Sequence, residues 1–214
     1  ECSGGGAAVT KTISAGGLSE ASAISFSLLE TTGTATYSIS GNLLNLIFNG
    51  SQAVANTSFF IYGNFTHSTS NGTTTFTAGT NAWSFTATSG SKTITPVAGT
   101  TYDFPWTFGS ASSTATWTLA ANLTLGATRQ LTLVTGTVDF NSKTISGGGI
   151  TINNTVGSVA IANTGTASFT TTLAITHTTG SLTLPFNITT SSTSGYAFTA
   201  GTLALSSYTL TTPI

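Results

Sequence analysis

Charged residues are nearly absent from this sequence of 214 residues: four Lys or Arg and five Asp or Glu make up 4% of the chain. Ordinary soluble domains carry roughly 25%. So little charge leaves weak repulsion between copies and favours self-association. The cations are scattered along the sequence, at Lys11, Lys92, Arg129 and Lys143. Because nucleic-acid binding requires clustered cations, we expect other copies of the chain as partners and no nucleic acid.

Methionine is missing altogether, and Cys2 is the only cysteine. A single cysteine cannot form an internal disulfide. No apolar run approaches the roughly 18 residues that a membrane-spanning helix needs, so we expect no membrane span in this sequence. Because the sequence contains no Met, we expect a secreted protein from which a leader has been removed, located outside the cell or at its surface; a fragment cut from a larger precursor is the alternative.

Motifs for catalysis and metal binding are absent as well. There is no G-x-S-x-G or H-E-x-x-H sequence and no Cys/His cluster. Asp103 and Asp139 each stand alone, whereas a calcium site needs several oxygen ligands brought together. We therefore expect neither an enzyme nor a bound metal or cofactor.

Ser and Thr are abundant, and they alternate with apolar residues. In one stretch Ile24, Phe26 and Leu28 alternate with Ser25 and Ser27. Such alternation is typical of β-strands, and Thr, Val, Ile and Phe favour strands. Turn residues such as Gly and Asn separate the apolar stretches. The pattern predicts an all-β chain.

A short phrase recurs five times in the second half of the chain. The phrases ATWTL, GTVDF, GSVAI, GSLTL and GTLAL begin 21, 21, 23 and 21 residues apart, at Ala115, Gly136, Gly157, Gly180 and Gly201. Their alignment gives two apolar columns. The first column contains Trp117, Val138, Val159, Leu182 and Leu203; the second contains Leu119, Phe140, Ile161, Leu184 and Leu205. Between them lie residues that face the other way, since strand side chains alternate.

A fixed period of this length is typical of a β-solenoid, in which each repeat forms one coil. We predict a β-solenoid-like repeat of about 21 residues for at least residues 115–214. An antiparallel β-sandwich of the jelly-roll or Ig-like kind is the alternative. Upstream, Ile39-Ser-Gly-Asn-Leu and Ile61-Tyr-Gly-Asn-Phe share a pattern at a spacing of 22, which suggests that the period extends further.

The chain divides by pattern into three regions. Residues 1–20 form an N-terminal tail, 21–110 an N-terminal β region and 111–214 the region with the repeat; one continuous domain over 21–214 is the alternative. The tail contains a candidate strand for addition to a neighbouring sheet. Its alternating residues are Ala7, Val9, Lys11 and Ile13.

Two sets of residues are candidates for contact with sugars. In TYDFPWTF, Tyr102, Phe104, Trp106 and Phe108 alternate, so they form either part of the core or an exposed aromatic platform for surface glycans. Packing in the core is the simpler interpretation. Asn-x-Ser/Thr sequences mark candidate N-glycosylation sites. They occur at Asn49, Asn56, Asn64, Asn71, Asn122, Asn153 and Asn187.

The stretches GNFTHSTSNGTTTFTAGT and WTLAANLTLGATRQLTLVTGTVDFNSKTI resemble the Thr/Gly-rich β-repeats of large bacterial surface proteins and phage tail proteins. This likeness covers about residues 61–214. The whole chain also resembles subunits of extracellular protein filaments in archaea and bacteria. In those subunits an N-terminal strand commonly completes the next subunit, and the resemblance assigns that role to Ala7–Ile13. Neither family supplies catalytic residues.

The sequence thus predicts a secreted all-β structural protein. We expect it to assemble with other copies into an extracellular, pilus-like filament or surface layer by strand addition, with adhesion as the downstream role. A carbohydrate-binding adhesin or phage tail-fibre module is the alternative.

Overall fold

The computed structural model describes residues 10–16, 19–29, 35–147, 149–154, 158–162, 173–177, 179, 181–183, 188–189, 196–204 and 210–211. These residues form 24 β-strands and one short 3-10 turn, η1 (Glu20–Ser22), but no α-helix. Every strand pairing recorded among them is parallel. Parallel pairing excludes the antiparallel sandwich and confirms the predicted β-solenoid.

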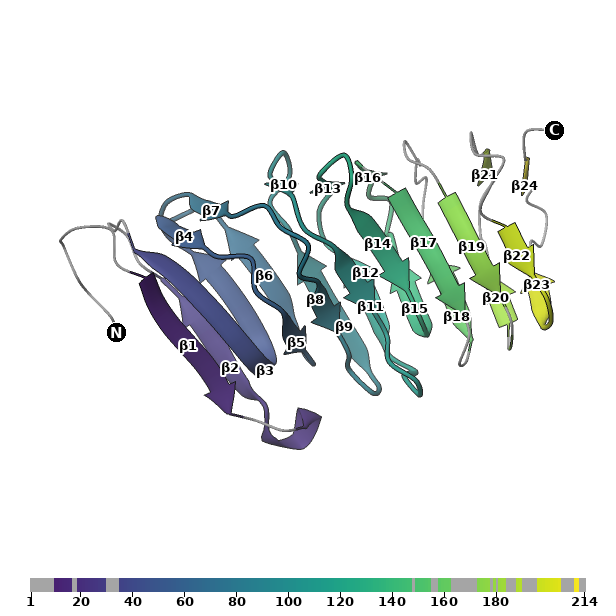
Figure 1. Ribbon diagram of the computed structural model, residues 1–214, viewed down its shortest axis with the longest axis horizontal. Helices are drawn as coiled ribbons and strands as arrows, with labels where there is room; N and C mark the ends of the chain where they lie inside the picture. Colours follow the sequence, from purple (N-terminus) through teal and green to yellow (C-terminus); the bar gives the residue numbers. More distant parts are fainter. Residues whose placement is uncertain are drawn as a thin grey trace.

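The strands stack in columns along the long axis of the molecule, from β1 and β2 at one end to β22 and β23 at the other (Figure 1). We call these columns the first, second and third faces. The first face contains β1 (Thr10–Gly16), β3 (Thr36–Asn49), β5 (Phe59–Ile61), β8 (Trp83–Phe85), β11 (Trp106–Phe108), β14 (Gln130–Leu133), β17 (Gly149–Asn154), β19 (Leu173–His177) and β22 (Tyr196–Phe198).

The second face shares the long strand β3 with the first. Its other strands are β2 (Ile24–Leu28), β6 (Phe65–Ser68), β9 (Ser91–Thr95), β12 (Thr116–Leu119), β15 (Gly136–Asp139), β18 (Val159–Ala162), β20 (Ser181–Thr183) and β23 (Thr202–Ala204). The third face contains shorter strands; the first of them, β4, pairs with the start of β3, and the later ones form two separate sheets. They are β4 (Gln52–Val54) with β7 (Thr74–Phe76), β10 (Thr101–Tyr102) with β13 (Leu123–Leu125) and β16 (Ile145–Ser146), and β21 (Ile188–Thr189) with β24 (Leu210–Thr211). Since β8 pairs with β11 and β9 with β12, the stack continues across residue 110.

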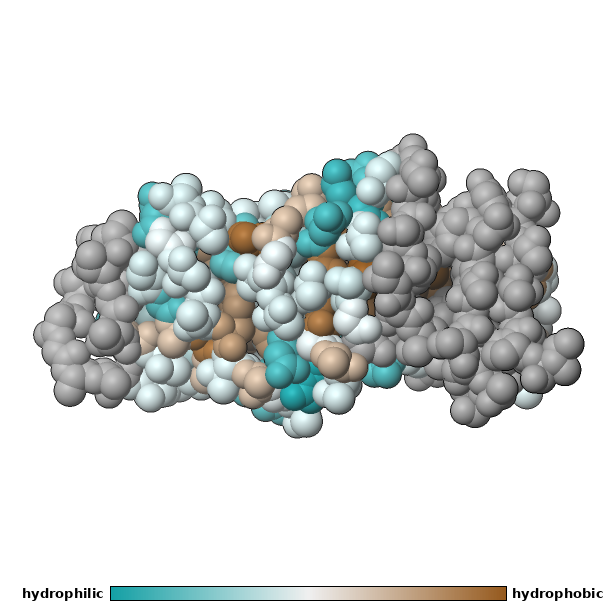
Figure 2. All heavy atoms as spheres, turned by 90° about the horizontal axis from the view of Figure 1, so that it is seen from above, coloured by the Kyte–Doolittle hydropathy of each residue, from teal (hydrophilic) through white to brown (hydrophobic). Residues whose placement is uncertain are grey.

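Alternation along each strand separates the interior from the surface. In β12, Trp117 and Leu119 are buried, whereas Thr116 and Thr118 are half-buried on the outer side. Each coil buries its inward side chains against the coils before and after it, so the apolar core runs along the axis. Seen from above, the described surface is mostly pale, near the middle of the hydropathy scale, with apolar atoms visible in its hollows (Figure 2). Thr, Ser and Gly give a surface of this kind.

One step of the predicted register is wrong. Val138 pairs with Ile161 instead of Val159, and Gly136 takes the place beside Val159. Because the shift is two residues, every side chain keeps its side of the sheet. The small residue has a steric reason: a Cβ on Gly136 would lie 2.9 Å from Cζ3 of Trp117 in the preceding coil. The predicted columns hold in the steps on either side of this one.

The upstream pattern also pairs differently from its predicted spacing. Ile61 pairs with Leu43 rather than with Ile39, because β3 passes from the first face to the second without a loop. The passage lies at Leu44 and Asn45, between the pairings with β5 and β6. Gly41, which has φ +97°, lies at the earlier change from the third face to the first. A side chain at Gly41 would collide with the carbonyl oxygen of Ala15, 2.0 Å from the Cβ position. The coils therefore continue through this region, but with a different number of residues in each.

Candidate functional sites at the ends and at one corner

The four alternating aromatic residues belong to the core. Tyr102, Phe104, Trp106 and Phe108 are at most 1% exposed. They do not lie on one straight strand, since the chain bends around Pro105 from β10 to β11. All four nevertheless point inward. The exposed aromatic platform that the alternation allowed is therefore wrong, and core packing is what the structure shows.

Within this aromatic core lies a buried pair of polar side chains. His67 Nδ1 is 2.7 Å from the Tyr102 hydroxyl oxygen, which also accepts a hydrogen bond from the Val97 N–H at 3.0 Å. Nε2 of His67 has no hydrogen-bond partner among the described residues. Burial lowers the pKa of His67 to about 4, so the imidazole is neutral at pH 7. Burial also raises the pKa of Tyr102, opposed by the hydrogen bond from Val97.

Charged groups do not gather anywhere in the described part of the chain. No three His, Cys, Asp or Glu side chains there lie close enough to hold a metal ion. Arg129 Nε contacts Asp103 Oδ1 at 2.6 Å and joins two adjacent coils. Glu20 in η1 reaches Thr88, whose hydroxyl donates to the Glu20 carboxylate at 2.6 Å. Both contacts connect segments of the fold. None of the described helices is long and apolar enough to cross a membrane.

The candidate glycosylation sites differ in accessibility. The side chains of Asn64, Asn71 and Asn122 are exposed, whereas Asn49 and Asn56 are half-buried. Four of these five carboxamide oxygens accept a backbone N–H from the next coil or the next turn. For example, Asn64 Oδ1 accepts from the Thr93 N–H at 2.8 Å. These hydrogen bonds join neighbouring turns of the solenoid, and this structural role explains the four asparagines without a glycan. Asn187 and the side chain of Asn153 lie outside the described residues.

The candidate strand for addition forms the first strand of its own solenoid. Lys11 and Ile13 lie in β1, which pairs with β3 of the same chain over its full length. Ala7 and Val9 lie outside the described residues. The ammonium group of Lys11 is 5.4 Å from the centre of the ring of Tyr37, the residue with which Lys11 pairs in β3.

The two ends of the described stack have unpaired strand edges. Among the described residues, β1 and β2 pair only with β3, whereas β22 pairs only with β19 and β23 only with β20. One edge of each of these four strands therefore has no backbone partner within the described chain. After Lys143 the sequence contains no Asp, Glu, Lys or Arg, so no such charge protects the C-terminal edge.

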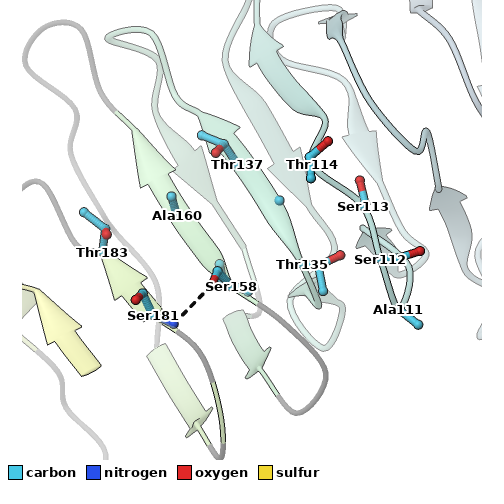
Figure 3. A pocket seen from close by; sticks show the side chains of 12 residues that line it. Ala111, Ser112, Ser113, Thr114, Thr135, Thr137, Ser158, Ala160, Ser181 and Thr183 are labelled. Carbon is cyan, nitrogen blue, oxygen red and sulfur yellow. Dashed lines mark hydrogen bonds between the residues drawn. The ribbon is translucent and has the colours of Figure 1, made fainter. Parts of the chain in front are cut away.

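A groove lies at the corner between the first and second faces. Its volume is about 480 Å³, and hydroxyl groups from several coils point into it (Figure 3). The polar lining residues are Ser112, Ser113, Thr114, Thr135, Thr137, Ser158, Ser181 and Thr183. Two of them are held by backbone oxygens: Ser113 Oγ donates to Ala87 O at 2.6 Å, and Thr135 Oγ1 donates to Ser110 O.

Unequal loops produce the groove. In one coil, residues 109–115 connect the first face to the second, but in the next coil Val134 and Thr135 alone make this connection. Both connections line the groove: Ala111 to Thr114 belong to the longer loop and Thr135 to the short turn. Sequence reasoning missed this site because its residues are ordinary Ser and Thr. The one usable signal was the unequal spacing between neighbouring apolar segments.

Comparison of the chain with protein families, characterised proteins and solved structures gives no match. The geometry of the described residues therefore carries the functional argument alone.

Proposed function

We propose that this chain is a structural subunit of an extracellular filament or surface layer, in which copies associate through the unpaired strand edges at the ends of the solenoid. The observation that supports this most directly is the state of those edges. Natural β proteins usually protect an edge with charge, proline or a covering segment. In the described residues neither end has a covering segment, and the strands β22 and β23 contain no charge.

The remaining features fit a structural role. An almost uncharged chain resists self-association only weakly. The described residues contain no group of three or more His, Cys, Asp or Glu side chains that could hold a metal ion. Few titratable groups also make stability depend little on pH above about 6.5, where the buried His67 is neutral in both the folded and the unfolded chain. Adhesion is then a property of the assembly.

The test is the assembly state of the purified full chain. Sedimentation over a range of protein concentrations, together with electron microscopy, should show elongated polymers whose length increases with concentration. Because the strand edges through which the copies would associate carry little charge, the length of the polymers should change little between low and high salt. Monomers at every concentration, in vitro and in material from the natural source, would contradict the proposal.

A neutral glycan in the corner groove is a second candidate function. The lining of this groove contains hydroxyl groups and no charged side chain, which suits hydrogen bonding to sugar hydroxyls. The test is a glycan array with Thr137→Val and Thr183→Val, which remove hydroxyls at nearly constant shape. Thr132→Val on the first face is the matched control. Glycan binding that is lost in the two groove variants and kept in the control would support this function. Unchanged binding in all three would exclude the groove.

A further inference from the structure

Some inward side chains of the first coil are uncovered, although Ala15 and Leu28 are buried. Ile24 pairs with Leu43 and, like it, faces the interior, yet Ile24 is 53% exposed and Leu43 is fully buried. Leu43 has a coil on each side, whereas Ile24 has a described coil on only one side. Phe26 and Ile13 are also only partly buried, although they pack against the core. The first coil therefore exposes a cross-section of the apolar core, which another coil would cover.

The backbone at this end is equally incomplete. In a parallel sheet, successive residues direct their N–H and C=O groups to opposite sides, so an edge strand leaves about half of them unpaired. β1 and β2 present such edges at one end, and β22 and β23 present them at the other. The single turn η1 does not cover the first coil, because Glu20 bonds to Thr88 further along the stack.

The two ends belong to the same parallel stack. Followed from one pairing to the next, Tyr196 of β22 lies in the column of Leu43, and Leu43 pairs with Ile24 of β2. Moving a second copy along the axis therefore brings its β22 beside the start of β2, with the two strands parallel as in the rest of the column. Such a contact joins two different surfaces, so it does not close and it produces a fibre.

We propose that the β1/β2 edge of one copy pairs in parallel with the β22/β23 edge of the next copy, so that the solenoid continues through the joint. This inference rests on the proposed function and specifies its partner and polarity. It differs from donation of an N-terminal strand, because β1 stays in its own chain and serves as the accepting edge. Lys11 is the one charge on this edge, and its inward position over Tyr37 weakens the joint.

The experiment blocks each end separately. Ile24→Lys puts a charge at a position that is half exposed in the single copy but covered in the joint. Leu203→Lys does the same in β23, the last described strand of the second face. Phe60→Lys is the matched control, since Phe60 is 46% exposed on β5, away from both ends. Circular dichroism checks folding; if Leu203→Lys fails to fold, Ala204→Lys places the charge on the same strand.

Sedimentation velocity should show that each blocked variant alone is a monomer and that Phe60→Lys polymerises like the original chain. An equimolar mixture of the two blocked variants should form dimers and nothing larger, because each variant keeps one functional edge. Lys11→Met should lower the concentration at which the original chain polymerises.

Four results would overturn the joint. Dimers of Leu203→Lys alone would show contact between two N-terminal ends. Normal polymers from both blocked variants would place the contact on a lateral surface; in these two cases the proposed self-association would survive. An unchanged polymerisation threshold in Lys11→Met would remove β1 from the joint. A monomeric original chain would refute the proposed function as well.

Discussion

Two stretches of this solenoid fill the same interior in different ways. From β6 to β12 the core is aromatic, and the Trp83 and Phe104 ring centres are 4.2 Å apart. The rings of this stretch belong to Phe65, Phe76, Trp83, Phe85, Tyr102, Phe104, Trp106, Phe108 and Trp117. From β13 onward the described core is aliphatic apart from Phe140. Its residues include Leu123, Leu125, Leu131, Leu133, Val138, Ile145, Val159, Ile161 and Leu182.

The difference shows that the parallel stacking of the backbone does not require core side chains of one particular size. In both stretches alternate side chains point inward and strands pair in parallel. The coils adjust their length to what they enclose. Phe65 pairs with Ile94, 29 residues further on, whereas Thr116 pairs with Thr137, 21 residues further on. Large rings thus accompany longer and less regular coils, and aliphatic side chains accompany short ones.

The strongest way to break the comparison is to empty the aromatic core at its centre. Trp83 packs within 6.1 Å, centre to centre, of six rings, among them Phe59 and Phe104. We expect Trp83→Ala to lower the free energy of unfolding by about 5 kcal/mol, against about 3 kcal/mol for Leu131→Ala in the aliphatic core. Denaturant titration measures both.

Trp83→Phe separates ring packing from the indole N–H. Nε1 of Trp83 has no hydrogen-bond partner among the described residues, so its removal should cost nothing in hydrogen bonding. We expect a loss of only about 1.5 kcal/mol for the reduced volume. If Trp83→Ala costs less than Leu131→Ala, the aromatic contacts add nothing beyond burial.

A change of pH should also separate the two stretches. His67 belongs to the aromatic core, and burial lowers its pKa to about 4 from the ordinary value of 6.5. Between these values the unfolded chain binds more protons than the folded one. The contribution of neutral His67 to the free energy of unfolding is therefore fully present above pH 6.5 and decreases as the pH falls. At pH 4 the free energy of unfolding should be lower by about 3 kcal/mol.

Hydrogen exchange followed by mass spectrometry at pH 7 and pH 4.5, corrected for the intrinsic rate, tests where this loss occurs. Amides of β6 to β11 should lose protection at the lower pH, and those of β13 to β15 should lose less. His67→Phe should remove the difference between the two pH values. An equal loss along the whole stack would show that the two stretches unfold as one unit.

The all-β class and the solenoid could be predicted from the sequence because the aliphatic coils are short and similar in length, with paired residues 19 to 23 positions apart. Their phrases recur at nearly constant spacing, and period-two alternation identifies the inward residues. The longer aromatic coils hide the same period, which is why the pattern at Ile39 and Ile61 gave the wrong partner. The two-residue shift at Gly136 was equally invisible, since it preserves which residues face inward.

The candidate sites were less predictable. Alternation in TYDFPWTF identified a common direction for four rings, but it could not say whether that direction was inward, because burial depends on the other coils. The groove depends on the difference between two loops in adjacent coils, one of residues 109–115 and one of Val134 and Thr135. No single segment contains that information. The unpaired strand edges at the ends of the described stack, by contrast, follow from stacking itself once the charge is known to be low.

The smallest expected effect tests the boundary between the two cores. Gly136 begins the first coil after Trp117, has φ +81°, and would place a Cβ 2.7 Å from the carbonyl oxygen of Ala115. Gly99 has a similar φ, +84°, but nothing lies within 4 Å of its Cβ position. We expect Gly99→Ala to cost about 1 kcal/mol for backbone strain alone. Gly136→Ala should cost about 2 kcal/mol more, because it also overfills the interior.

A double variant then shows whether the last aromatic ring is responsible. The Gly136 Cβ position lies 2.9 Å from Cζ3 of Trp117, so Trp117→Leu removes that contact and leaves the one with Ala115. We expect Gly136→Ala to cost less in a Trp117→Leu background than alone, with a coupling of about 1 kcal/mol in a double-mutant cycle. A coupling of zero would mean that the carbonyl of Ala115 sets the need for glycine. The backbone contact with Ala115 alone would then require glycine at position 136. The change from aromatic to aliphatic packing would have no effect on this requirement.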